Sequence, residues 1–242
     1  MKRLINVMVM VSALLNIAAP GAQAYEYTIE LDALNGIYYY PGGEFTAIPV
    51  TGGLQSVLSN YASVAKNSGG ITGSFETFCV ETEVDFYPYN WGGPIYGVNV
   101  SNNAIGGNIK TGGNNPLTLG AAWLYYEFAT GKLHNFDYSY GSTRNTDSGA
   151  LQEAIWIFMN QDHINSSFDP PQNAYYTEAV NALGLANVYN ASHGAYGVHV
   201  LNLYNTDGSP AQNQLVLTPE PATALLLMFG LIILAGVTRK MT

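Results

Sequence analysis

The sequence has little cysteine and little charge. Its 242 residues include one cysteine, Cys79, and only 10% charged residues, where about 25% is usual in globular proteins. A single cysteine excludes an internal disulfide and any zinc site built on several thiolates. Basic residues are scarcest, with eight Lys and Arg against 17 Asp and Glu, a net charge of −9. Nucleic acid is therefore not an expected partner, because its phosphates need clusters of Lys and Arg.

Apolar and aromatic residues, by contrast, are abundant. Apolar residues make up 48% of the chain and aromatic residues 12%, with 18 tyrosines. This supply is enough to bury a core, which argues against intrinsic disorder. The length fits one domain or a small pair once targeting segments are removed.

The first 24 residues have the pattern of a secretory signal peptide. Lys2 and Arg3 precede an almost wholly apolar run at residues 4–19. Ala22-Gln23-Ala24 then supplies the small residues of a cleavage site. We expect cleavage after Ala24, so that the chain leaves the cytoplasm.

The last 24 residues form a second targeting segment. The tripeptide Pro219, Glu220, Pro221 is followed by an apolar run at 222–237 and by Arg239 and Lys240. The run is shorter than the roughly 20 residues that a bilayer-spanning helix needs. These three parts resemble a PEP-CTERM sorting signal. The alternative is a plain tail anchor.

The PEP-CTERM resemblance implies a route rather than an activity. It implies a Gram-negative bacterium, an exosortase of the inner membrane as a partner during export, and membrane contact only through the transient C-terminal helix. The released chain would be secreted or held at the cell surface or in the extracellular matrix. The mature body at 25–218 then keeps four basic and 16 acidic residues, a net charge near −12.

Hydrophobic periodicity predicts an α+β fold for this body. Alternating apolar residues predict strands, and spacings of three and four residues predict helices. The predicted strands are 25–31, 37–40, 45–50, 74–82, 95–100, 196–204 and 214–217, and the predicted helices are 54–66, 116–131, 147–161 and 173–183. The order predicts a mostly antiparallel β-sandwich or barrel-like body with a helical insertion at about residues 116–183.

Two residues do not fit their surroundings. Gln152 shares a predicted helix face with Ile155, Trp156 and Met159, where a buried carboxamide without a partner costs about 1–3 kcal/mol. Cys79 is a solitary thiol in a chain expected to leave the reducing cytosol. Each has an ordinary explanation: a backbone or water hydrogen bond for the glutamine, and simple hydrophobic burial for the cysteine.

Short segments around these residues resemble the motifs of thioester domains in bacterial surface adhesins. The segment 78–81, Phe-Cys-Val-Glu, resembles their aromatic-Cys-apolar-polar motif. The segment 151–155, Leu-Gln-Glu-Ala-Ile, resembles their apolar-Gln-polar-apolar-apolar motif and is continued by Trp156. The order agrees as well, with the cysteine on an expected strand and the glutamine 73 residues later on an expected helix. Residues 121–124 resemble a helix between the two motifs in that family.

The thioester resemblance implies a cross-link between the Cys79 sulfur and the Gln152 side-chain carbonyl. The family uses the bond once, when a nucleophile such as a lysine amine displaces the sulfur. The chain would then be an adhesin-like protein and not an enzyme, without a cofactor, and its partner an amine-bearing molecule on another cell, a matrix or a biofilm polysaccharide. Because a thioester hydrolyses when wet, aromatic residues are expected to shield it: Phe75, Phe78, Trp123, Tyr125, Tyr126 and Trp156.

Other readings of the sequence remain open. Exported, Tyr-rich β domains often bind glycans without covalent chemistry, and the candidate residues are Tyr87, Tyr89, Trp91, Tyr138, Tyr140, Tyr175 and Tyr176. A Cys-His hydrolase would use Cys79 with one of the histidines 134, 163, 193 and 199, none of which has metal-ligand spacing. The alternating acids Glu81, Glu83 and Asp85 could bind calcium or act on a glycoside, although a solvated strand face is the simpler interpretation.

Overall fold

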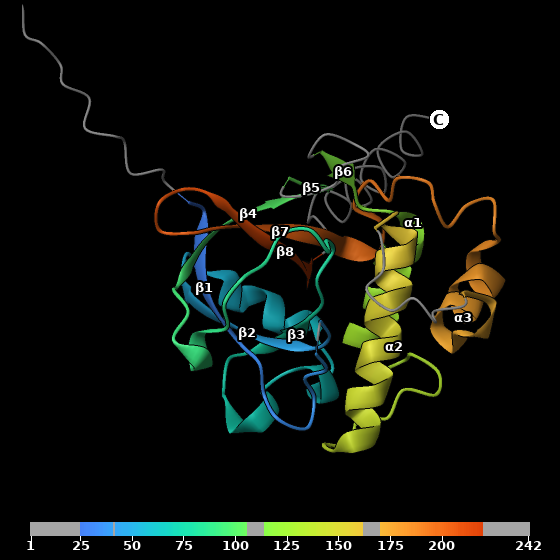
Figure 1. Cartoon of the computed structure of the whole chain (residues 1–242), viewed down its shortest axis with the longest axis horizontal. Coiled ribbons are helices and arrows are strands. Elements are labelled where there is room, and N and C mark those ends of the chain that lie inside the picture. Colours follow the sequence, from blue (N-terminus) through green and yellow to red (C-terminus); the bar gives the residue numbers. More distant parts are fainter. Residues whose placement is uncertain (1–24, 41, 106–113, 162–169, 220–242) are drawn as a thin grey trace, which may run out of the picture.

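Figure 1 shows the computed structural model of the chain, which describes residues 25–40, 42–105, 114–161 and 170–219. The signal peptide expected at residues 1–24 lies outside the described residues, as does the sorting segment from Glu220 onward. Within these ranges, the structure contains no helix that is both long and apolar enough to span a bilayer.

A curled antiparallel sheet forms the body, which confirms the predicted α+β class (Figure 1). Its spatial order is β3-β2-β1-β4-β7-β8. The strands are β1 (Tyr27–Asp32), β2 (Phe45–Thr51), β3 (Phe75–Thr77), β4 (Tyr96–Ser101), β7 (Val198–Tyr204) and β8 (Pro210–Leu217). A separate pair consists of β5 (Asn103–Ala104) and β6 (Asn115–Pro116).

The two edges of this sheet meet in a seam. Just beyond β3, the N–H of Val80 donates to the carbonyl of Asn213 at 3.1 Å, and the N–H of Leu215 donates to the carbonyl of Phe78 at 3.1 Å. The chain after β3 therefore leaves β2 and pairs with β8. Joining the edges satisfies backbone groups that an open sheet would leave unpaired. The segment predicted as one strand at 74–82 is thus a short strand followed by this seam.

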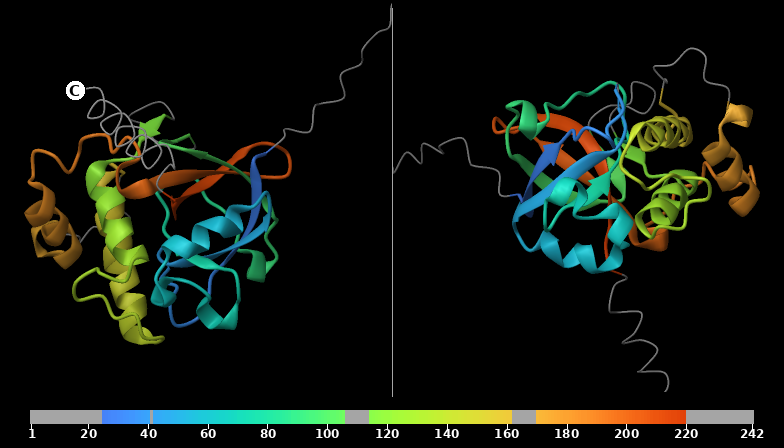
Figure 2. Two further views of the ribbon diagram at one scale, coloured as in Figure 1. Left: turned by 180° about the vertical axis from the view of Figure 1, so that it is seen from behind. Right: turned by 90° about the horizontal axis from the view of Figure 1, so that it is seen from below.

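Among the described residues, three α-helices lie between β4 and β7 in the sequence, in the range where helices were predicted. They are α1 (Leu119–Ala129), α2 (Ser142–Phe158) and α3 (Ala174–Leu183). Thr118 and Asn173 cap α1 and α3, because their side-chain oxygens accept hydrogen bonds from backbone N–H groups of the first turn. Figure 2 shows α1 and α2 side by side against the sheet, with α3 packed outside them.

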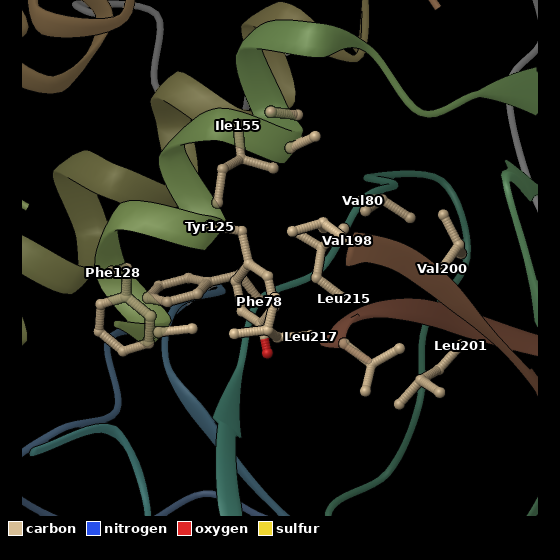
Figure 3. Packing of buried hydrophobic residues seen from close by; sticks show 14 of the residues in the cluster. Phe78, Val80, Tyr125, Phe128, Ile155, Val198, Val200, Leu201, Leu215 and Leu217 are labelled. Carbon is tan, nitrogen blue, oxygen red and sulfur yellow. The ribbon is translucent and has the colours of Figure 1, made fainter. Parts of the chain in front are cut away.

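Sheet and helices share one hydrophobic core. Figure 3 shows Phe78 from the seam pointing toward Tyr125 and Phe128 of α1. The rings of Phe78 and Phe128 meet edge to face with their centroids 5.0 Å apart, an arrangement that aromatic pairs favour. Leu215 of β8 and Ile155 of α2 complete this part of the core (Figure 3). The helical insertion is therefore packed into the β body.

Several local predictions were wrong. Residues 37–40 form no strand: they follow a turn at 35–37, in which Gly36 takes a left-handed conformation and the Tyr38 N–H bonds back to the Leu34 carbonyl. The predicted helix 54–66 is a 3₁₀ segment at Leu54–Asn60 followed by a second short turn. Apolar residues spaced by three lie on one face in a 3₁₀ helix as well as in an α-helix, so the spacing did not distinguish the two.

The helix boundaries also differ from the predicted ones, most clearly at the starts of α1 and α2. Pro116 belongs to β6 and not to α1. Helix α2 begins at Ser142, five residues before the predicted start at Asp147. Its first turns contain Arg144 and Ser148, which are buried and bind Glu44. A polar sequence is thus held in the helix by partners from another part of the chain.

Candidate functional site

Cys79 lies in the seam where the sheet closes. It forms an antiparallel bridge with Gln214 of β8, between the seam hydrogen bonds of its neighbours Phe78 and Val80. Because successive side chains alternate across extended chain, Phe78 enters the main core while Cys79 faces the other way. The cysteine is fully buried and not in a disulfide.

The structure brings Gln152 directly onto Cys79. The Cys79 N–H donates to Oε1 of Gln152 at 2.9 Å, and Nε2 of Gln152 donates to the Cys79 carbonyl at 2.7 Å. Gln152 is 1% exposed, and its helix-face neighbours Ile155, Trp156 and Met159 are equally buried, as the spacing predicted. A backbone partner therefore satisfies the buried carboxamide, and that partner is the one cysteine of the chain.

The sulfur itself is held by two further glutamines. The Cys79 thiol donates to Oε1 of Gln212 at 3.0 Å, and Nε2 of Gln214 donates to Sγ at 3.2 Å. Both glutamines come from β8, two residues apart and so on one face of the strand. We call Cys79, Gln152, Gln212 and Gln214 the carboxamide cluster. Sequence reasoning missed the last two, although a Gln-x-Gln alternation in a buried strand was a visible signal.

Burial raises the pKa of the Cys79 thiol far above its ordinary value. The hydrogen bond from Gln214 acts in the opposite direction, while the nearby charges of Glu81 and Asp85 raise the pKa further. The thiol is therefore protonated at neutral pH, as its donation to Gln212 requires. Reaction at this sulfur depends on positioning more than on an abundant thiolate.

An aromatic layer covers the cysteine on the side away from the main core. Phe45 and Trp156 form a small buried group with Cys79 and Ala33, and Tyr38 and Phe86 pack against it. We call Tyr38, Phe45, Phe86 and Trp156 the aromatic layer. Of the side chains predicted to shield the site, Trp156 lies here. The others belong to the main core or pack against it: Phe75, Phe78, Trp123, Tyr125 and Tyr126.

A glycine lets the β1–β2 connection approach this layer closely. A Cβ atom at Gly42 would lie 2.5 Å from the Trp156 ring and 3.3 Å from Cγ of Gln152. One helical turn earlier, a Cβ at Gly149 would lie 2.7 Å from the ring of Tyr39. The connection therefore rests on helix α2 beside Gln152, where any larger side chain would separate them.

A buried ion pair fixes the other end of the same helix face. Arg144 donates through Nε to Glu44 at 2.8 Å and through Nη2 to its second oxygen, and Ser148 donates to Glu44 at 3.0 Å. We call Glu44, Arg144 and Ser148 the ion-pair cluster. Arg144, Ser148 and Gln152 follow one another at intervals of four residues, so they share one face of α2. The ion pair thus orients the face that carries Gln152.

Two buried polar atoms near the sulfur have no hydrogen-bond partner among the described residues. They are Nε1 of Trp156 and Oε1 of Gln214. Leaving such an atom unpaired costs about 1–3 kcal/mol. Comparable unpaired atoms occur elsewhere in the described residues, for example in Asn60 and Asn202, so these two do not by themselves mark a reactive site.

The other candidate residues are distributed as follows. Glu81 is buried and its Oε2 accepts the Asn213 N–H at 3.2 Å. Glu83 and Asp85 are exposed, as predicted, but residues 81–85 form no strand. No group of His, Cys, Asp and Glu able to hold a metal exists in the part of the chain that is described. Among the described residues, the hydrogen-bond partners of the thiol are two glutamines, whereas a Cys-His hydrolase needs an imidazole within reach of the sulfur. The candidate His163 lies outside the described residues.

The predicted glycan-binding residues separate into two groups. Tyr87, Tyr89 and Trp91 are exposed and lie together around a short 3₁₀ turn at Tyr89–Trp91. The remaining candidates lie elsewhere: Tyr138, Tyr175 and Tyr176 pack in or on the main core, and Tyr140 is exposed beside Gly36 and Gly69.

No family model, no curated protein and no solved structure matches this chain. The chemistry of the site therefore follows from its own geometry. In that geometry, the Gln152 carboxamide is held on the backbone of Cys79, whose thiol is buried under aromatic rings.

Proposed function

We propose that this chain is an exported, adhesin-like protein in which Cys79 and Gln152 form an internal thioester that captures an amine on another surface. One observation carries the proposal. Both polar atoms of the Gln152 carboxamide bind the backbone of Cys79, at 2.9 and 2.7 Å, although 73 residues separate the two. Export rests on the signal-peptide pattern and on the resemblance of the C-terminal segment to a PEP-CTERM signal.

The contacts of Gln152 favour attack at its side-chain carbon. The Cys79 N–H that binds Oε1 draws electrons from the carbonyl and stabilises the negative oxygen that forms during attack. Sγ leaves its hydrogen bonds to Gln212 and Gln214 and bonds to Cδ of Gln152. The Cδ–Nε2 bond then breaks, and the thiol proton leaves with the amide as ammonia. Fixed orientation can supply about 7–11 kcal/mol toward such a step.

In the second half of the reaction, an amine displaces the sulfur from the thioester, and each molecule can react in this way only once. The nitrogen of an incoming amine bonds to Cδ, the Cδ–S bond breaks, and one amine proton passes to the sulfur. The product is an amide between Gln152 and the captured molecule. Because Cys79 is fully buried beneath Phe45 and Trp156, water is kept from the thioester until then.

Intact mass of the secreted mature protein tests the proposal. The wild type should be lighter than its sequence mass by one ammonia, and Cys79→Ala and Gln152→Ala should each have the full mass. Methylamine should add one equivalent, located at Gln152 by peptide mapping. A wild type at full mass, with one thiol that titrates after unfolding, would overturn the proposal.

Gln212 provides the matched control, because its carbonyl oxygen also lies within hydrogen-bond distance of the sulfur. Its Nε2 donates to the carbonyl of Glu81 at 2.6 Å. Among the hydrogen bonds of the described residues, no backbone N–H donates to its oxygen, so its carbonyl is not polarised in this way. We therefore expect Gln212→Ala to keep the loss of ammonia. If Gln212→Ala restored the full mass and Gln152→Ala did not, Gln212 and not Gln152 would form the thioester, and the proposal would be wrong.

Noncovalent glycan binding is the second candidate function. The exposed cluster of Tyr87, Tyr89 and Trp91 favours it, since flat aromatic faces outside the core are typical of binding surfaces. The two functions are compatible, because this cluster adjoins the carboxamide cluster.

A further inference from the structure

An aromatic pocket opens directly above the carboxamide cluster. Its volume is about 290 Å³, and six of its nine lining residues are aromatic. Gln212 lines its floor and also accepts the Cys79 thiol proton at 3.0 Å. Phe45 lines the pocket and shares the buried group that contains Cys79. One layer of side chains therefore separates the pocket from the sulfur, and Gln212 reaches through that layer.

The pocket wall is held rigid from behind. The Asn90 side chain donates to the Ala33 carbonyl at 2.9 Å and accepts the Ala33 N–H at 3.1 Å, and the Asn90 N–H donates to Asp32 at 3.0 Å. The hydroxyl of Tyr96 binds both backbone groups of Tyr87, at 2.8 and 3.0 Å. These contacts fix the turn that carries Trp91, so the site is formed before anything binds, which lowers the entropic cost of binding.

The aromatic rings leave flat faces open to solvent. Trp91 is 47% exposed and Tyr87 56% exposed. Trp91 meets Tyr38 edge to face, with centroids 5.6 Å apart and planes at 82°. The two rings are therefore nearly perpendicular and form a corner of the pocket. Such a corner presents the face of one aromatic ring and the edge of the other to a ligand, which suits a saturated ring whose C–H bonds can contact the aromatic face.

The pocket also contains groups that bind hydroxyls and a positive charge. Asp85 is the charged residue of the lining and is exposed. The hydroxyls of Tyr38, Tyr40 and Tyr87 and the carboxamide of Gln212 supply neutral donors and acceptors. A carboxylate beside aromatic faces attracts an ammonium group through both charge and the ring quadrupole. A lysine side chain would use the carboxylate but leave most of the hydroxyl groups without partners.

We propose that this pocket binds an amino sugar with a free amine, as one residue of a hexosamine polysaccharide. Its volume is at the lower end for small-molecule sites, which fits a single sugar ring. The ring stacks on the Tyr38–Trp91 corner, and Asp85 holds the ammonium. Capture rests on the proposed function: the ammonium first gives one proton to solvent, the neutral sugar nitrogen bonds to Cδ of Gln152, the Cδ–S bond breaks, and a second proton passes from the nitrogen to the sulfur.

Binding is tested without the thioester, in the Cys79→Ala variant. Titration calorimetry measures the affinity for glucosamine oligomers and for matched N-acetylglucosamine oligomers. We expect tighter binding of the free amine, a loss of at least tenfold on Trp91→Ala, and loss of the preference for the amine on Asp85→Asn. Tyr140→Ala, which removes an exposed tyrosine outside the pocket, should change neither.

The outcomes separate this inference from the proposed function. If the wild type lacks one ammonia and reacts with methylamine but Cys79→Ala binds no glucosamine oligomer, the sugar site is wrong and the thioester stands. If Cys79→Ala binds the oligomer and the wild type has full mass, the sugar site stands and the thioester is wrong. Equal or tighter binding of Nα-acetyl-lysine amide than of the glucosamine monomer would replace the sugar by a protein lysine and overturn the inference.

Discussion

Two buried polar clusters lie along one face of helix α2 and differ in what stabilises them. The ion-pair cluster is charged, and its guanidinium and hydroxyl donors converge on the Glu44 carboxylate. The carboxamide cluster is neutral, and two atoms near it, in Trp156 and Gln214, have no partner among the described residues. The first is complete as a structural lock. The second holds a nucleophile, the Cys79 thiol, beside a carboxyl derivative, the Gln152 carboxamide, which binds the backbone of Cys79.

This difference indicates which cluster carries chemistry. Breaking a buried ion pair is costly because it strands a charge, so the ion-pair cluster can serve the fold alone. Neutral carboxamides are weaker anchors, yet two of them hold one sulfur and a third holds the backbone of the same residue. Variants in and beside each cluster test this difference.

The largest effect is expected at the ion pair. Arg144→Met leaves the Glu44 carboxylate buried without its cation, so the free energy of unfolding should fall by about 3–5 kcal/mol. Urea denaturation followed by tryptophan fluorescence measures it, in the Cys79→Ala background so that no thioester contributes. Lys132→Met removes an exposed cation and should cost less than about 0.5 kcal/mol. Equal losses in the two variants would contradict the structural role of the ion pair.

The next effect concerns the thioester itself. The proposed bond closes a loop between two residues 73 apart, and disulfides that close such loops stabilise proteins by about 2–4 kcal/mol. Methylamine should therefore lower the Tm of the wild type and leave the Tm of Cys79→Ala unchanged, as calorimetry records on samples whose mass has been checked. An unchanged Tm after complete methylamine addition would show that the bond does not constrain the fold.

A third and smaller effect is expected at Gly42. A methyl group there would meet the Trp156 ring at 2.5 Å and Gln152 at 3.3 Å, and overpacking of this kind costs about 1–3 kcal/mol. Gly42→Ala should also raise the fraction of protein at full mass, because Gln152 is displaced. Trp156→Phe removes the clashing ring atoms, so the double variant should recover part of both losses. If the losses of the two single variants simply add in the double variant, the contact between residue 42 and the Trp156 ring is not their cause.

The smallest effect is a pH dependence at Glu76. Burial and the charge of Glu44 raise its pKa well above the ordinary value, against hydrogen bonds from Ser68 and Thr46 and the charge of Arg144. The folded protein then keeps a proton that the unfolded chain loses, so stability falls as pH rises above the ordinary glutamate pKa.

Glu76→Gln should reduce this fall, because the amide oxygen can still accept from Thr46 but nothing ionises. Thermal unfolding from about pH 4.5 to pH 8 measures the slope for the wild type and the variant. Glu83→Gln, at an exposed position, is the control. Identical slopes in the wild type and Glu76→Gln would remove Glu76 as the cause.

Much of the fold followed from local patterns. The alternation at 25–31 and 45–50 located β1 and β2, and the spacing at 173–183 located α3, in which Asn173 is the N-cap and not a helical residue. These segments bury one regular face each, and such a face is visible in a single sequence. The start of α2 was missed because Arg144 and Ser148 are polar, and only their contact with Glu44, 100 residues or more away, explains their burial.

The candidate site could be predicted in part, because two of its residues stand out in the sequence itself. Gln152 was noticed because it interrupts an apolar helix face, and Cys79 because it is the only cysteine. Gln212, Gln214 and all of the aromatic layer except Trp156 were not noticed, since they are ordinary residues until the sheet curls. Their roles depend on the seam between β3 and β8, which no local pattern encodes.

The sequence by itself determined the α+β class, the acidic and lysine-poor surface, and the pair of side chains whose types can form a thioester. Only the tertiary structure decided that the pair meets, which carbonyl the backbone polarises, and where an aromatic pocket adjoins the sulfur. The physical reason is that propensity and periodicity act over a few neighbouring residues. Reactive geometry instead depends on hydrogen bonds between segments 73 and more residues apart, and these form only when the sheet closes.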